Sequence, residues 1–468
     1  MKRIGAWLLA VAILSAFMIG CTSSGDVSLE TEAESVQYIY DSEMVQTSTD
    51  SRAAFSEKGY YYLVNGFLYF YDVNSDVSIP VCSKSDCLHD SVTCSAYALD
   101  KVDYDPYDLK GVSVNCLGNS VWYDNGKLYM IKRDEAGDYL MQYDSDYTNE
   151  IKVCTLADKG TVIGAPNGSA QDMVLMYKGY LYYYTITPVH ASELVDNTAT
   201  ITCNRIKVAA NSKREELGTF EMAIDYAVFS TYAVGKVCAG DDCVYFVNGG
   251  TTRWLSKNDP VQYRICLYDC NRGSFKTVLN KNADNTLDVL GEGTGEVQTV
   301  RDDIVCADDE NNLYIVTDES KIVKITPEGK SEVIYRNGNA QGINSLVWDG
   351  THVYFYEKTS GAGAIVRIDK NGNKMGRYNI TINTEFFEEK YISGTKSVDI
   401  KIYGVDSQNI VVYTDNDYIK GLECSTLMKN SCGYVRTYAV GIIRKDALDD
   451  SSGEIRKIYE YSGYLDIQ

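Results

Sequence analysis

The amino-acid sequence predicts an all-β fold, a β-propeller of about seven blades, from three observations. Short runs of apolar residues and tyrosines recur along the chain, each preceded by Gly, Asn or Asp, which favour turns. The runs have the length of strands, and no long segment shows the 3.6-residue periodicity of an amphipathic helix. Tyrosine is over-represented, with 39 copies against 11 of phenylalanine, and tyrosine favours strands.

The repeats fill the chain between residues 36 and 468. Seven copies span Gly66–Tyr71, Gly126–Ile131, Gly179–Tyr184, Asp242–Val247, Asn312–Val316, His352–Tyr356 and Ile410–Tyr413. A four-stranded blade needs roughly 40–50 residues plus loops, and radial repetition protects the strand edges that a large open sheet would expose. The alternative is a pair of β-sandwich domains, which would not predict seven copies of one hairpin.

Individual hairpins can be read inside the repeats. After Leu313–Thr317, the turn residues Asp318–Ser320 lead into a second expected strand at Lys321–Thr326. After His352–Tyr356, a Gly-rich turn and then Asn371-Gly372 divide the next strands. Because alternate residues of a strand face opposite sides, most of the tyrosines are expected to pack between blades.

The N-terminus predicts export. Lys2 and Arg3 precede an uncharged apolar run, Ile4–Ile19, which is too short to span a bilayer comfortably. Gly20-Cys21 follows, so residues 1–20 resemble a bacterial lipoprotein signal that leaves Cys21 to carry the lipid. Met18 and Ile19 stand where that family prefers Leu and a small residue, which keeps an ordinary cleaved signal and an uncut anchor as alternatives. Residues 21–35 form a polar, acidic tether without aromatic side chains.

Charge narrows the partners. The net charge is −21, and removal of residues 1–20 takes away two cations, which gives 42 minus 65, or −23. Nucleic-acid binding needs a basic footprint, so no nucleic-acid partner is expected. Anionic lipid would not attract this surface electrostatically. Membrane association is therefore expected through the lipid anchor, with the protein on the outer face of a bacterial cell membrane.

Cysteine spacing marks one loop in particular. Cys82, Cys87, His89 and Cys94 form a Cys-x4-Cys-x-His-x4-Cys pattern whose donors suit tetrahedral Zn²⁺. In an exported protein a disulfide among the thiols is favoured over the metal, and a redox thiol is the third interpretation. The 14 cysteines leave an odd number once Cys21 carries lipid. Two further pairs flank turn-like segments and are disulfide candidates: Cys238 with Cys243, and Cys424 with Cys432.

Short acidic clusters offer oxygen ligands that Ca²⁺ accepts. They lie at Asp72–Asp76, Asp144–Asp146, Asp369–Gly372 and Asp415–Asp417, and none has the closing Glu of an EF-hand loop. A turn is the favoured interpretation of each, because Asp and Asn are turn residues in their own right.

The segment Asn311–Gly329, with strand, turn, strand and a closing Pro-x-Gly, resembles blades of the TolB-like and NHL-like propellers. Tyrosine-rich repeats on a lipidated stem are similar to propeller lipoproteins of monoderm bacteria. This resemblance implies architecture and surface location but no activity, since propellers host many functions.

The expected function is a non-enzymatic binding or scaffold module for an extracellular ligand or protein. One alternative is a hydrolase acting on carbohydrate or peptide at the propeller mouth, for which His89, His190 and His352 are the available histidines. The other is a metal or thiol sensor built on the Cys82–Cys94 loop. No catalytic residue is assigned.

Overall fold

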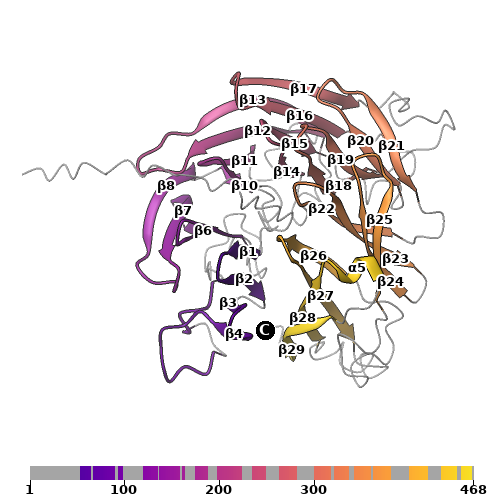
Figure 1. Ribbon diagram of the computed structural model, residues 1–468. Helices are drawn as coiled ribbons and strands as arrows, with labels where there is room; N and C mark the ends of the chain where they lie inside the picture. Colours follow the sequence, from indigo (N-terminus) through magenta and orange to yellow (C-terminus); the bar gives the residue numbers. More distant parts are fainter. Residues whose placement is uncertain are drawn as a thin grey trace, which may run out of the picture. The chain divides into compact units, whose positions relative to one another are not determined.

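The computed structural model confirms the predicted propeller. Among the residues that it describes, the strands form seven antiparallel sheets, each a four-stranded meander in chain order, and these sheets are the blades (Figure 1). All of these residues belong to one compact unit, Tyr38–Gln468. The described residues are 53–64, 67–89, 93–98, 120–134, 136–158, 161–163, 174–187, 198–223, 235–248, 263–281, 300–317, 321–336, 342–359, 362–380, 400–419, 434–450 and 455–465.

The first three blades come from the N-terminal half of this unit. Blade 1 consists of β1 (Ala53–Ser56), β2 (Gly59–Val64), β3 (Phe67–Asp72) and β4 (Val77–Pro80). Blade 2 consists of β5 (Val121–Asp124), β6 (Lys127–Asp134), β7 (Gly137–Asp144) and β8 (Ile151–Asp158). Blade 3 consists of β10 (Val174–Tyr177), β11 (Tyr180–Thr187), β12 (Thr198–Lys207) and β13 (Glu215–Ala223), and the short β9 (Val162–Ile163) also pairs with β11.

The other four blades follow in order. Blade 4 is β14 (Lys236–Ala239), β15 (Cys243–Asn248), β16 (Tyr263–Asp269) and β17 (Ser274–Lys281). Blade 5 is β18 (Val300–Ala307), β19 (Leu313–Thr317), β20 (Lys321–Ile325) and β21 (Ser331–Arg336). Blade 6 is β22 (Gly342–Trp348), β23 (Val353–Thr359), β24 (Ala362–Ile368) and β25 (Lys374–Ile380). Blade 7 is β26 (Ile400–Val405), β27 (Asn409–Ile419), β28 (Tyr434–Arg444) and β29 (Arg456–Leu465), with the short helix α5 (Ala447–Asp450) before β29.

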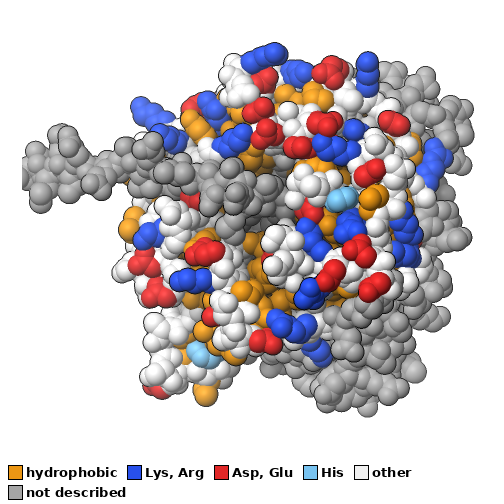
Figure 2. Space-filling model, viewed as in Figure 1, with side chains coloured by type: hydrophobic (Ala, Val, Ile, Leu, Met, Phe, Trp, Pro, Cys, Tyr) orange, Lys and Arg blue, Asp and Glu red, His pale blue; other side chains and the backbone are white. Residues whose placement is uncertain are grey.

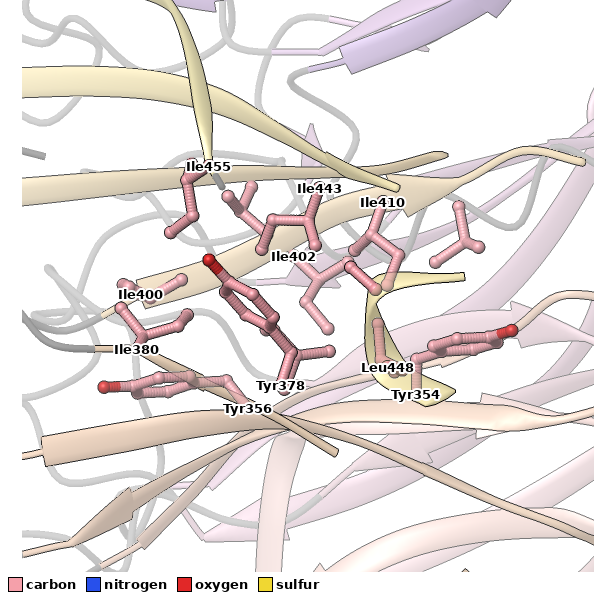
Figure 3. Close-up of a cluster of buried hydrophobic side chains, with 14 of the residues drawn as sticks. Tyr354, Tyr356, Tyr378, Ile380, Ile400, Ile402, Ile410, Ile443, Leu448 and Ile455 are labelled. Carbon is pink, nitrogen blue, oxygen red and sulfur yellow. The ribbon is translucent and has the colours of Figure 1, made fainter. Parts of the chain in front are cut away.

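The hydrophobic core is divided among the seven junctions between blades. Each junction holds one cluster of buried side chains from its two sheets. Figure 3 shows the junction of blades 6 and 7, where Tyr354, Tyr356 and Tyr378 lie among isoleucines of the next sheet. Tyrosine fills these junctions because its ring supplies a large apolar area while its hydroxyl reaches a polar partner. Most of the tyrosines whose burial the structure describes are buried in these clusters, as expected.

Burial along the strands follows their position in the blade. Second strands such as β19 and β15 are buried at every residue, because both faces of the sheet meet a neighbouring blade. Outer strands are half-exposed, as in β4, where exposed and half-buried residues alternate. The continuous apolar runs that the sequence displays are therefore mainly the second strands.

Blade 1 departs from the predicted repeat. The run Gly66–Tyr71 was matched to the others, but it belongs to β3, and the second strand of this blade is β2, with Tyr60, Tyr61 and Tyr62. Both runs follow a glycine and are rich in tyrosine, so they look alike in sequence. The alternative of tandem β-sandwiches is wrong, since the sheets follow one another around a ring.

Among the described strands, blade 7 and blade 1 share none where the ring closes, and the two blades lie side by side in Figure 1. Tyr62 of blade 1 packs with Tyr403 and Tyr413 of blade 7 in one buried cluster. The Tyr403 hydroxyl donates to the Leu63 carbonyl at 3.3 Å, and the Asn409 amide donates to the Tyr60 hydroxyl at 3.0 Å. Side-chain packing and these two hydrogen bonds thus join the first and last blades.

Charged side chains of both signs are interspersed over the face shown in Figure 2.

The acidic clusters behave mainly as turns. The Asp369 carboxylate accepts the backbone N–H groups of Asn371 and Asn373 at 2.9 and 2.8 Å, and the Asp72 carboxylate accepts those of Asn74 and Ser75. The segment Asp415–Asp417 differs, because it lies inside β27. The calcium interpretation therefore has no support from these turns.

The described part of the chain contains no helix with the length and apolar character required to cross a bilayer. The predicted signal (residues 1–20), Cys21 and the tether (residues 21–35) lie outside the described residues.

Candidate metal centre

The loop that follows blade 1 is anchored against the end of β3. The Val81 amide donates to the Leu68 carbonyl at 2.9 Å, and the Leu68 amide donates to the Ala96 carbonyl at 2.8 Å. Tyr97 forms an isolated antiparallel bridge with Phe67, and their rings meet edge to face. These contacts fix both ends of the loop, Val81 and Tyr97, to the first residues of β3.

Between these anchors the structure brings together all four predicted ligands. The Sγ atoms of Cys82, Cys87 and Cys94 and a ring nitrogen of His89 lie within 4.8 Å of one another. His89 Nδ1 is 3.4 Å from Cys94 Sγ. A zinc ion with Zn–S bonds of about 2.3 Å and a Zn–N bond of about 2.0 Å would separate its ligand atoms by about 3.6–3.8 Å in a tetrahedron. The donor atoms are thus close to the spacing that zinc requires.

Backbone conformation allows the awkward spacing of Cys87 and His89. In an extended segment, residues two apart point to the same side and lie about 6.7 Å apart along the strand. His89 has a φ of 56°, in the left-handed region. This turns the chain between the second and fourth ligands, and the imidazole then faces the Cys94 thiol.

Hydrogen bonds to sulfur prepare the ligands. The Ser95 hydroxyl donates to Cys82 Sγ at 3.0 Å, and the Ala96 amide donates to Cys94 Sγ at 3.4 Å. Burial raises the pKa of Cys82, but the Ser95 hydroxyl and the Lys84 backbone outweigh it and lower this pKa to about 6. Burial raises the pKa of Cys94. Such outer contacts orient metal ligands and tune their basicity.

Ser95, Lys84 and Ala96 were not singled out from the sequence. Lys84 also donates from Nζ to the Thr93 carbonyl at 2.7 Å, which ties the two arms of the loop together. The sequence could have indicated these three residues only by their position, since Lys84 lies between Cys82 and Cys87, and Ser95 and Ala96 follow Cys94. Cys94 and Ala96 are buried against Phe67, whereas Cys82, Cys87 and His89 are half-buried. The centre is therefore reachable from solvent but rests on an apolar base.

The remaining cysteines are dispersed. The described cysteines are all separate thiols. Cys238 and Cys243 lie on paired strands of blade 4 and are buried in one cluster. No bond joins their sulfur atoms in the structure, and their disulfide stays a prediction. Cys424 and Cys432 lie outside the described residues. Burial raises the pKa of the Cys203 and Cys306 thiols well above the ordinary value, in keeping with inert core residues.

The two histidines that the structure describes lie in different blades. His89 belongs to the loop after blade 1, and His352 lies in the turn between β22 and β23, where its Nδ1 is 2.8 Å from the Thr351 hydroxyl. His190 lies outside the described residues. The His-centred version of the hydrolase hypothesis gains no support from this arrangement.

No protein-family model matches the sequence, and no curated protein matches it significantly. Solved structures resemble the fold distantly. BamB from Moraxella catarrhalis is 11% identical, with 78% of this chain and 81% of that chain covered and a TM-score of 0.37. A catalytically inactive virginiamycin B lyase from Staphylococcus aureus, with quinupristin, is 12% identical over 79% and 93%, with a TM-score of 0.39. TolB from Acinetobacter baumannii is 10% identical over 69% and 60%, with a TM-score of 0.31. The chain itself is a seven-bladed β-propeller.

Proposed function

We propose that this chain is an outward-facing, lipid-anchored propeller scaffold whose first blade carries a zinc-stabilised loop. The observation that carries the zinc assignment is the convergence of four donors, three sulfurs and one imidazole nitrogen, within 4.8 Å. Three thiolates and one imidazole complete a tetrahedron around Zn²⁺ and leave no open position for water or substrate, which is the pattern of structural rather than catalytic zinc.

In this role the ion would hold the middle of a loop whose ends are anchored on β3. In the described part of the loop, the one β-bridge is that of Tyr97 to Phe67. A ligand present at a thousand times its dissociation constant stabilises the folded state by about 4 kcal/mol. Zinc would therefore keep a shaped surface at one end of blade 1, where a protein or other extracellular ligand can dock.

Metal content tests the zinc assignment. The purified protein, prepared without chelator, is expected to contain one zinc per chain by elemental analysis and native mass spectrometry. Cys94→Ser is expected to lose the zinc, while Cys154→Ser, which changes a buried thiol of blade 2, keeps it. A zinc-free protein whose mass is lower by about 2 Da, the two hydrogens of one disulfide, would instead establish the disulfide interpretation.

The anchor is tested separately. It rests on the charged head, the apolar run and Gly20-Cys21 of the sequence. Cys21→Ala is expected to move the protein from the membrane fraction to the medium or to leave an unprocessed precursor. A variant that is cut at the signal but stays with the membrane would contradict lipidation at Cys21.

A further inference from the structure

A second site lies between blades 3 and 4, far in sequence from the cysteine loop. A pocket of about 530 Å³ opens there. Lys178, from the turn before β11, and Tyr180 of β11 line one side. Tyr268, at the end of β16, and Arg272, in the following turn, line the other. Arg205 of β12 lies between them.

Arg205 is held in a fixed orientation. Its guanidinium lies 4.7 Å from the ring centre of Tyr180 and 4.9 Å from that of Tyr268. Its Nε donates to Glu215 at 2.8 Å, and its Nη2 is 2.7 Å from the same carboxylate. The Arg205 side chain is 20% exposed. The guanidinium is also hydrogen-bonded to the Tyr182 hydroxyl, so two of its five N–H groups remain for a carboxylate.

Three cations line a pocket on a strongly acidic protein. Among the described residues the lining includes Lys178, Arg205 and Arg272 and no carboxylate side chain, whereas the whole chain carries a net charge of −21. The Glu215 carboxylate offsets part of the positive charge of Arg205. Asp241 and Asp242, whose carboxylate oxygens lie 3.7 and 3.6 Å from Lys178 Nζ, offset part of the charge of Lys178. The Arg272 side chain is 84% exposed, and its ion pair with Asp269 is long at 3.8 Å. The guanidinium can therefore turn toward an anion. A small anion is favoured, because the surrounding acidity would repel a long polyanion.

The strand pairing rules out a peptide that adds a strand, and the lining suits a sugar. An extended peptide that binds by adding a strand requires an unpaired sheet edge. β11, β12 and β16 are each paired on both sides, so the pocket offers no edge. It offers instead the half-buried ring of Tyr180 and the polar side chain of Asn271, which suit the C–H face and the hydroxyls of a pyranose.

We propose that this pocket binds a single uronic-acid residue, with the carboxylate at Arg205 and Arg272 and the sugar ring against Tyr180. Arg205, whose orientation Glu215 fixes, supplies its remaining N–H groups, and Arg272 closes over the carboxylate from the rim. The site uses blades 3 and 4 only, and it therefore does not depend on zinc at blade 1.

Calorimetric titration at low salt tests the proposal. Methyl glucuronide is expected to bind at least tenfold more tightly than methyl glucoside, which lacks only the carboxylate. Arg205→Gln should weaken glucuronide binding at least tenfold, and Arg272→Ala several-fold. Arg444→Ala is the matched control, since Arg444 is an exposed arginine of blade 7 that also has an aspartate neighbour, and it should leave binding unchanged.

Four outcomes would overturn the proposal. These are equal binding of glucoside and glucuronide, equal binding of inorganic phosphate or acetate, no binding of glucuronide at millimolar concentration, and equal effects of Arg272→Ala and Arg444→Ala. Because Arg272 is largely exposed, its variant will fold even if Arg205→Gln does not. Cys94→Ser should retain glucuronide binding, so failure of the zinc assignment and failure of this proposal are distinguishable.

Discussion

An ion pair between blades 6 and 7 makes the stability of the ring depend on pH. Lys445 Nζ lies 2.5 Å from Asp349 Oδ2, and the side chain of Asp349 is only 4% exposed. Asp349 Oδ1 accepts the amides of Thr351 and His352 at 2.9 and 2.8 Å. Desolvation raises the pKa of Asp349, but the Lys445 ammonium and these amides outweigh it and lower the pKa to about 2.

The sign and size of the effect follow from this shift. The folded pKa is below the ordinary value of 3.8, so the charged carboxylate stabilises the fold above pH 4, and this stability is lost as the pH falls through 2. At about 1.4 kcal/mol per pKa unit, Asp349 contributes about 2 kcal/mol at pH 7, about 1 kcal/mol at pH 3 and less at pH 2.

Asp349→Asn tests this reasoning, because it keeps the shape of the side chain but sets an amide NH2 donor against either the Lys445 ammonium or the Thr351 and His352 amides. Urea denaturation followed by tryptophan fluorescence should show a loss of about 2 kcal/mol or more at pH 7. At pH 3, the difference in the free energy of unfolding between Asp349→Asn and the original protein should be smaller by about 1 kcal/mol than at pH 7. Asp446→Asn is the control, since the Asp446–Arg444 pair is exposed on both sides, and it should change little at either pH. An Asp349→Asn loss of equal size at pH 7 and pH 3 would refute the assigned pKa.

Three other perturbations probe the packing. Gly363→Ala should lower the free energy of unfolding by about 1–3 kcal/mol, because its Cβ would lie 1.9 Å from the Tyr356 hydroxyl oxygen. In urea denaturation, the double variant with Tyr356→Leu should lose less stability than the sum of the two single losses. Simple additivity of the two losses would contradict the clash. Tyr60→Phe removes a hydrogen bond to Asp406 across the closure of the ring and should lower the free energy of unfolding by about 1–3 kcal/mol; an unchanged midpoint would show that this bond adds nothing. Cys203, fully buried with a raised thiol pKa, should resist iodoacetamide in the folded protein and react in urea, as peptide mass mapping would show; modification under native conditions would mean that the blade opens.

The sequence alone determined the fold class, because the relevant signal is local. Turn residues, strand-length apolar runs and the preference of tyrosine for half-buried strands lie within a few positions of one another. Which run forms which strand of a blade is not local, and the first repeat was placed one strand late. Gly59–Val64 and Gly66–Tyr71 have the same local character, and only the pairing of β2 between β1 and β3 distinguishes them.

The four metal-ligand residues could also be named from the sequence, since Cys82, Cys87, His89 and Cys94 lie within one short loop. Spacing could not decide how close the donor atoms come. That depended on the left-handed conformation of His89 and on the anchoring of the loop to the end of β3.

The pocket between blades 3 and 4 was not visible in the sequence at all. Lys178, Arg205 and Arg272 are separated by complete strands, and nothing in their immediate neighbours marks them as partners. They meet because the packing of β11 and β12 against β16 buries a common cluster of aromatic side chains. Local propensity therefore determined the strands, whereas the convergence of distant side chains was decided by burial of apolar surface between blades, which only the tertiary structure specifies.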